Sequence, residues 1–138
     1  DLTNCIQLKV IGKEAFSSTP IESIFVPTTV GRIGERAFYK WNKLLLINLS
    51  KNLLLKKIEN GTFCESNLSF ISISSSIEQI GKIAFSNCKN LQTIEIPQNS
   101  ELSQICEKAF YGASSLMLIY LPKKFKEFGM KEFRNWIK

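Results

Sequence analysis

Leu91-Gln-Thr-Ile-Glu-Ile-Pro97, followed by Ile105-Cys-Glu-Lys-Ala-Phe110, is the stretch of sequence that decides the fold. Its first part alternates apolar and polar residues and ends in proline, which is typical of a short β-strand. The same pattern returns as Ile21-Glu-Ser-Ile-Phe-Val-Pro27 and Ile33-Gly-Glu-Arg-Ala-Phe38. Because an internal repeat determines the architecture of a whole chain, the repeat is the first feature to analyse.

Phenylalanine marks one position of each copy, and an isoleucine stands five residues before it. The phenylalanines are Phe16, Phe38, Phe63, Phe85 and Phe110, and the isoleucines are Ile11, Ile33, Ile58, Ile80 and Ile105. Successive phenylalanines are 22, 25, 22 and 25 residues apart, so the unit is a double repeat of 47 residues. A degenerate sixth copy follows at residues 128–133. The alternating spacing predicts that longer and shorter turns alternate along the stack of repeats.

Each copy also carries an apolar triplet that predicts a strand. The triplets begin at Ile21, Leu44, Leu68, Leu91 and Leu116 and end at Val26, Leu49, Ile73, Ile96 and Leu121. One copy cannot bury its apolar side alone, whereas stacked copies share a continuous core. We therefore expect a solenoid with a parallel sheet on its concave face and a column of phenylalanines behind it. Replacing Phe63 or Phe85 by alanine should cost about 3–5 kcal/mol.

The residues before each phenylalanine, such as Lys13-Glu14-Ala15, are good helix formers. We expect a short helical turn there on the convex side. A short extra strand at each Ile-Gly step is also compatible with the pattern.

We interpret residues 1–138 as one solenoid domain, with repeats over 1–122 and a basic, aromatic cap over 123–138. Asp1-Leu2 aligns with Glu95-Ile96, so the chain begins inside a strand of a preceding repeat. This indicates a segment of a longer repeat protein, whose exposed ends would favour self-association.

The composition excludes several classes of protein. Apolar residues make up 44% of the chain, but no apolar run is long enough to span a membrane, and the first residues do not form a secretory signal. The net charge of +6 and the pI of about 9.2 favour acidic partners. We interpret this charge as a solvated surface. An anionic ligand, such as a glycan, phospholipid or nucleic acid, is the alternative, and we expect no specific nucleic-acid partner.

Catalytic residues are scarce. The chain has no histidine and its one aspartate is Asp1, so neither a Ser-His-Asp nor a Cys-His arrangement can form. Glutamates at equivalent positions predict a solvated surface; they are Glu14, Glu35 and Glu107. The cysteines are widely spaced and do not resemble a zinc set; they are Cys5, Cys64, Cys88 and Cys106. We expect Cys88 and Cys106 to be buried small apolar residues. The chain is therefore predicted to be no enzyme, without cofactor or metal.

These repeated strings resemble the BspA-like, treponema-type leucine-rich repeat over essentially the whole chain. The cysteine that the family places three residues after phenylalanine remains only as Cys88, which weakens the case for a cysteine ladder. The segment Pro97-Gln-Asn-Ser-Glu-Leu102 is most similar to the sequences of surface antigens of trichomonad parasites. The resemblance implies a leucine-rich-repeat solenoid, display at the cell surface or secretion, and adhesion to host or bacterial surfaces.

Strand alternation predicts two columns of residues that point outward from the sheet. One column holds Ser23, Leu46, Phe70, Thr93 and Leu118, and its neighbour holds Phe25, Asn48, Ser72, Glu95 and Tyr120. A cluster of apolar residues along a groove is typical of a contact surface, although strand propensity alone can also place such residues there.

The leading hypothesis is a non-enzymatic surface module that binds a protein or glycan on another cell or matrix through these columns. The alternative is a structural element that assembles end to end. Three sequons, at Asn48, Asn60 and Asn67, give weak support for export. A glycan on Asn48 would contradict binding through the sheet.

Overall fold

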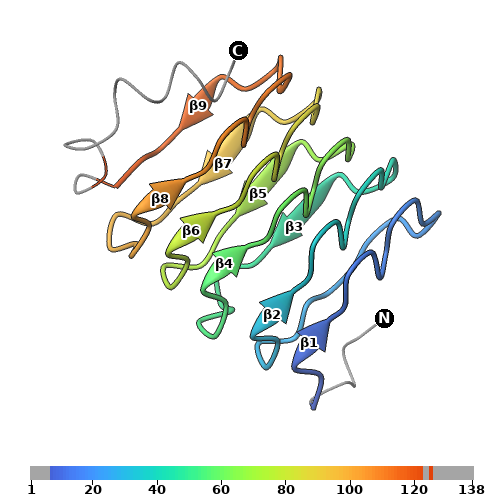
Figure 1. The fold of residues 1–138 in the computed structure, drawn as a ribbon, viewed down its shortest axis with the longest axis horizontal. Coiled ribbons are helices and arrows are strands. Elements are labelled where there is room, and N and C mark those ends of the chain that lie inside the picture. Colours follow the sequence, from blue (N-terminus) through green and yellow to red (C-terminus); the bar gives the residue numbers. More distant parts are fainter. Residues whose placement is uncertain (1–6, 123–124, 126–138) are drawn as a thin grey trace.

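The structure is a computed structural model that describes residues 7–122 and residue 125. The chain winds through successive coils that lie side by side, and two rows of short strands run along the stack (Figure 1). Each coil carries one of the repeated phenylalanines. The expected fold class, a solenoid of the leucine-rich-repeat type with parallel strands, is confirmed.

One row contains the strands at the Ile-Gly steps: β1 (Val10–Ile11), β2 (Arg32–Ile33), β4 (Lys57–Ile58), β6 (Gln79–Ile80) and β8 (Gln104–Ile105). The other row contains β3 (Leu46–Asn48), β5 (Phe70–Ser72), β7 (Thr93–Glu95) and β9 (Leu118–Ile119). They form three parallel sheets with the orders β1-β2, β4-β6-β8 and β3-β5-β7-β9. The extra strands at the Ile-Gly steps are therefore real. The connections at 49–56 and 96–103 are longer than the connection at 73–78, as the alternating spacing predicts.

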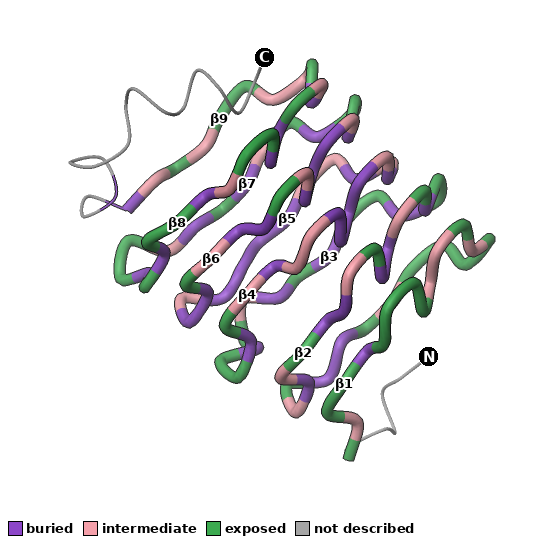
Figure 2. Tube along the Cα trace, in the orientation of Figure 1, coloured by how far each residue is buried: buried purple, intermediate pink, exposed green. Residues whose placement is uncertain are grey.

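The core is one continuous apolar spine shared by all coils. Buried residues recur at the same places in successive coils (Figure 2). The phenylalanine rings stack in order along the chain, with centroids 5.8 Å apart for Phe16–Phe38, 5.2 Å for Phe38–Phe63, 5.3 Å for Phe63–Phe85 and 5.4 Å for Phe85–Phe110. Stacked, buried rings combine a large apolar area with favourable ring geometry. The predicted column is confirmed.

The expected helical turn before each phenylalanine is wrong. Residues 7–122 contain no helix, and the segments around the phenylalanines are tight turns. Two residues in each turn, four positions apart, have left-handed φ angles, for example Arg36 (53°) and Lys40 (52°) in the second coil. A right-handed helix cannot pass through such residues.

Hydrogen bonding explains why the turns replace helices. Within a turn, alternate N–H groups donate to a carbonyl of the same coil, and the others donate to the next coil. The N–H of Phe38 donates to Thr62 (2.9 Å) and that of Phe63 to Ala84 (2.9 Å). An α-helix would direct these donors back along its own segment. Stacking of the coils therefore overrides the helix propensity of the lysines and glutamates.

A glycine after the isoleucine permits two coils to approach closely. A Cβ built on Gly34 would lie 2.6 Å from the backbone N of Lys13 and 2.8 Å from the backbone C of Gly12. A Cβ built on Gly12 would have no atom of the described residues within 4 Å. The glycine is thus required where the preceding coil packs against it.

The first apolar triplet, residues 21–26, is not a strand in the structure. The predicted cap at 123–138 lies outside the described residues except for Phe125, which is buried against the core. In the part of the chain that is described, no helix is long and apolar enough to cross a membrane.

Candidate binding surface

The residues of both predicted columns lie on the β3–β5–β7–β9 sheet and its flanking segments. The ladder pairs Leu46 with Phe70, Phe70 with Thr93, and Thr93 with Leu118. It also pairs Asn48 with Ser72 and Ser72 with Glu95. Because residues paired in register point to the same side of a sheet, the paired members of each predicted column form a row. Ser23, Phe25 and Tyr120 are not part of the ladder. We refer to the side that these rows occupy as the sheet face.

Large apolar side chains are exposed on the sheet face. The exposed fractions are 54% for Phe25, 62% for Leu46, 48% for Leu118 and 53% for Tyr120. Phe70 and Thr93 are half-buried, while Ser23, Asn48 and Glu95 are exposed. The strands bury the residues between these positions, such as Ile47 and Ile71. The exposed apolar side chains therefore have no place in the core and form a surface patch.

Ser72 adds little exposed surface to the sheet face, although it lines one hollow there, beside Glu95 and Tyr120. Its residue is buried, with 8% exposure, although its ladder partners Asn48 and Glu95 are exposed. A serine side chain is short, so its longer neighbours in the adjoining strands shield it. The ladder register agrees with the predicted direction of Ser72, but its side chain is more enclosed than those of Asn48 and Glu95.

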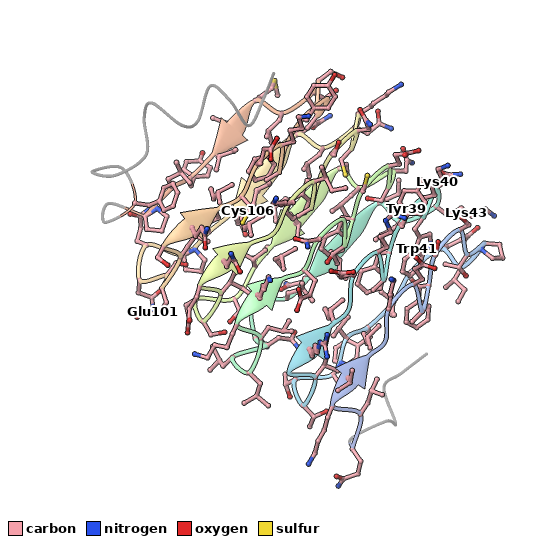
Figure 3. The ribbon with its side chains drawn as sticks, in the orientation of Figure 1. Tyr39, Lys40, Trp41, Lys43, Glu101 and Cys106 are labelled. Atoms are coloured by element: carbon pink, nitrogen blue, oxygen red, sulfur yellow. The ribbon has the colours of Figure 1, made fainter. Side chains whose placement is uncertain are left out.

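Ser23 and Phe25 lie beside the sheet without joining its ladder. The segment around them is fixed at both ends: the indole N–H of Trp41 donates to the carbonyl of Ile21, and the Asn52 side-chain amide donates to the carbonyl of Pro27 (2.7 Å). Figure 3 labels Trp41 at the edge of the stack. Between these two contacts the segment forms no ladder with β3, and a hollow lined by residues of both separates them.

The separation leaves an apolar hollow of about 320 Å³ on the sheet face. Phe25 and Leu46 line it, together with Asn48, Thr28 and Lys51 at its rim. A second hollow of about 320 Å³ lies further along the sheet, where Tyr120 and Glu95 meet Ile96 and Pro97. Two separated recesses with exposed aromatic walls can receive projecting side chains of a partner.

The cysteines offer no reactive thiolate at the core positions. Burial raises the pKa of the Cys88 thiol to about 11, although its hydrogen bond with Ser66 acts in the opposite direction. Burial, followed by the nearby Glu65 carboxylate, also raises the pKa of Cys64. Since the thiolate is the nucleophile, these two thiols are inert near neutral pH.

Cys106 corrects one expectation, because it is half-buried rather than buried. It occupies the glycine position of its coil, where the side-chain amide of Gln79 lies 3.3 Å from its sulfur. Cys64, Cys88 and Cys106 are free thiols, and Cys5 lies outside the described residues. Within the described ranges, no three His, Cys, Asp or Glu side chains come together to hold a metal ion.

A polar cleft on the edge of the stack escaped the sequence analysis. It has a volume of about 730 Å³, and four asparagines contribute to its lining: Asn42, Asn67, Asn87 and Asn90. Asn42 and Asn67 each stand four residues after a repeated phenylalanine, and Asn90 stands five after. This recurrence was the available signal.

The fold and its stacked apolar spine define a leucine-rich-repeat solenoid. The chain belongs to the BspA type leucine-rich repeat family, whose six-copy repeat region matches residues 9–138. No curated protein sequence matches the chain.

Two solved structures show the same fold. A leucine-rich repeat protein from Bacteroides ovatus shares 26% sequence identity with a TM-score of 0.61, and the match covers 84% of this chain and 35% of that protein. A leucine-rich cell-surface protein from Faecalibacterium prausnitzii shares 22% identity with a TM-score of 0.50, over 83% of this chain and 39% of that protein. The chain thus spans little more than a third of the length of these two proteins.

Proposed function

We propose that this chain is a non-enzymatic binding module of a cell-surface protein, and that the sheet face recognises a partner on another cell or on the extracellular matrix. The observation that carries the proposal is the set of exposed apolar side chains at the two ends of the sheet face, Phe25 and Leu46 at one end and Leu118 and Tyr120 at the other, each beside a hollow. Soluble proteins rarely expose such clusters unless they meet a partner. The likeness to a cell-surface protein of the same fold supports display at the surface.

Aromatic anchors in recesses favour a protein partner over a glycan for this face. Aromatic residues concentrate binding energy at protein interfaces, especially where a pocket excludes water. Phe25, Phe70 and Tyr120 span the face from the first described coil to the last strand. We further propose a relationship to the surface antigens of trichomonads, which is based on the sequence of residues 97–102.

The test replaces Phe25, Phe70 and Tyr120 together by alanine. Flow cytometry would compare the binding of fluorescent wild-type and variant protein to cultured epithelial cells. The variant should lose binding while its circular dichroism spectrum and melting curve stay unchanged, because the three side chains lie outside the core. Tyr111→Ala is the matched control, since Tyr111 is an exposed tyrosine (45%) at the phenylalanine turn rather than on the sheet face. Equal binding by the triple variant and the wild type would refute the site.

A second candidate is a structural element that assembles end to end. Val10 and Ile21, in the first described coil, are exposed apolar residues, with exposed fractions of 52% and 47%, and they favour this function. Light scattering across a concentration series tests it. Growth of the mean mass with concentration supports assembly, and a monodisperse monomer at high concentration contradicts it.

A further inference from the structure

We propose that the asparagine-lined cleft beside the phenylalanine turns is a saccharide-binding site, separate from the sheet face. The cleft crosses three coils, because Asn42 follows the turn of Phe38, Asn67 that of Phe63, and Asn90 that of Phe85. Adjacent coils of a parallel ladder lie about 4.8 Å apart. This spacing is comparable to the width of one pyranose ring, so one sugar unit can meet two coils.

The lining of the cleft contains no apolar residue. Besides the four asparagines, Glu65, Ser66 and Lys89 complete it. This composition disfavours a lipid or an apolar peptide, because the lining offers no apolar side chain for either to pack against. It suits a ligand whose surface is covered by hydroxyl groups.

The asparagines keep much of their hydrogen-bonding capacity. The side-chain amide of Asn90 donates to the side-chain oxygen of Asn67, which leaves the amide group of Asn67 and the oxygen of Asn90 available. Within the described structure, the side chains of Asn42 and Asn87 form no hydrogen bond. Each amide offers both donors and an acceptor. A sugar hydroxyl is likewise donor and acceptor, so two neighbouring hydroxyls can bind one amide at both of its ends.

The charges of the cleft do not select a highly anionic ligand. Lys40 lies 3.7 Å from the Glu65 carboxylate, and the hydroxyl of Tyr39 donates to the same group (3.2 Å). Figure 3 labels Tyr39 and Lys40 together at this edge, far from Glu101 at the opposite end of the coils. Lys89 therefore remains as one cation of the cleft without an ion pair to any described residue. A single cation is too few for a phosphate-rich partner, which requires several.

The experiment is saturation-transfer difference NMR with the whole chain and four neutral disaccharides, namely lactose, maltose, cellobiose and chitobiose. We expect at least one to bind, and Asn42→Ala/Asn90→Ala to weaken its binding by about tenfold or more. Both side chains are exposed, so the fold should persist, which circular dichroism checks. Asn99→Ala is the matched control because Asn99 is exposed but lies outside the cleft, and it should leave binding unchanged.

Two further probes separate other kinds of ligand. The proposal is overturned if none of the disaccharides binds, or if the asparagine variant binds as well as the wild type. Binding of a glycine-rich tetrapeptide alone would also overturn the proposal. So would binding of 3'-sialyllactose alone, if Lys89→Ala abolishes that binding and the Asn42→Ala/Asn90→Ala variant retains it. The Phe25, Phe70 and Tyr120 variant should bind disaccharide normally, so failure of this site and failure of the proposed function are distinguishable.

Discussion

Phe16 and Phe63 occupy the same position of the repeat, yet Phe63 is fully buried and Phe16 is half-buried. Phe63 stacks between Phe38 and Phe85, which belong to the coils on its two sides. The stacking partners of Phe16 in the described structure, Phe38 and Trp41, both belong to the second coil. The two phenylalanines therefore differ in burial because Phe63 has a stacking partner in the coil on each side, whereas the described partners of Phe16 lie on one side. In this fold, a coil is stabilised by adjacent coils more than by its own sequence.

The sheet shows the same contrast. β5 is paired on both sides, with β3 and β7, over three residues each. The corresponding residues 23–25 of the first described coil match the strand pattern equally well but join no ladder. The same substitution should therefore have different effects in the central coils and in the first described coil.

Phe63→Ala should lower the free energy of unfolding by about 3–5 kcal/mol, because it removes a fully buried ring and leaves a cavity. Phe16→Ala should lower it by only about 1–2 kcal/mol, since part of that ring is already exposed. Urea unfolding followed by circular dichroism measures both. Equal losses for the two variants would contradict the dependence of burial on neighbouring coils.

Gly34→Ala should destabilise the protein by about 1–3 kcal/mol, because the new methyl group would overlap the backbone of the preceding coil. Gly12→Ala is the control in the first described coil, where no described atom lies within 4 Å of the added Cβ, and it should be neutral or slightly stabilising. Thermal unfolding of both variants provides the comparison. A destabilised Gly12→Ala protein together with a normal Gly34→Ala protein would show that the packing of these coils is misunderstood.

Much of this architecture was predictable from the sequence, because it depends on periodicity. Every copy has an apolar residue at the positions equivalent to Phe63 and Ile71. These positions determine which side chains face inward, and the stacking of the coils follows from them. The turn conformation was not predictable, because Lys13, Glu14 and Ala15 favour a helix locally and only bonds to the next coil override them. Propensity scales omit such long-range bonds.

The sequence predicted which side chains of the sheet face point outward, but not which of them are exposed to solvent. The ladder register of Leu46 and Phe70 follows from the period of two. The burial of Ser72 and the absence of a ladder between the Phe25 segment and β3 depend on packing between neighbouring coils, which the period of two does not describe. The asparagine cleft was overlooked because exposed asparagines also suit ordinary turns.

Cys88 provides a test at alkaline pH. Thr19 stands at its position in the first described coil and is half-buried, whereas Cys88 is fully buried. The pKa of the thiol rises from an ordinary value of 9.0 to about 11 on folding. Its contribution to stability is therefore complete below pH 9 and is lost as the pH rises towards 11, because only the unfolded chain releases the proton in that range.

Between pH 8 and pH 10, the wild type should lose about 1 kcal/mol more of its free energy of unfolding than Cys88→Ala does. Urea unfolding at both pH values measures the difference. Parallel pH dependences of the two proteins would mean that Cys88 has an ordinary pKa in the folded state.

Ile83 is a branched residue in a left-handed conformation, with a φ of 49°. Gly61 holds the equivalent position in the preceding coil, with a φ of 62°. Asparagine tolerates this conformation better than isoleucine does. Ile83→Asn should therefore raise the free energy of unfolding by about 0.5–1 kcal/mol, and Lys82→Asn, at an exposed neighbour without a positive φ, should not. A less stable Ile83→Asn protein would show that the side chain contributes more through packing than its strain costs.

Amide hydrogen exchange, followed by NMR, tests the shared spine most directly. The backbone N–H groups of Phe38, Phe63 and Phe85 donate to the following coil, at 2.9, 2.9 and 2.7 Å. They should exchange slowly and at similar rates, through global unfolding, although they lie in turns. The N–H groups of Ser23 and Phe25, which join no ladder, should exchange much faster. If the phenylalanine amides exchanged as fast as those of Ser23 and Phe25, the coils would not be joined through a common core, and the account would be wrong.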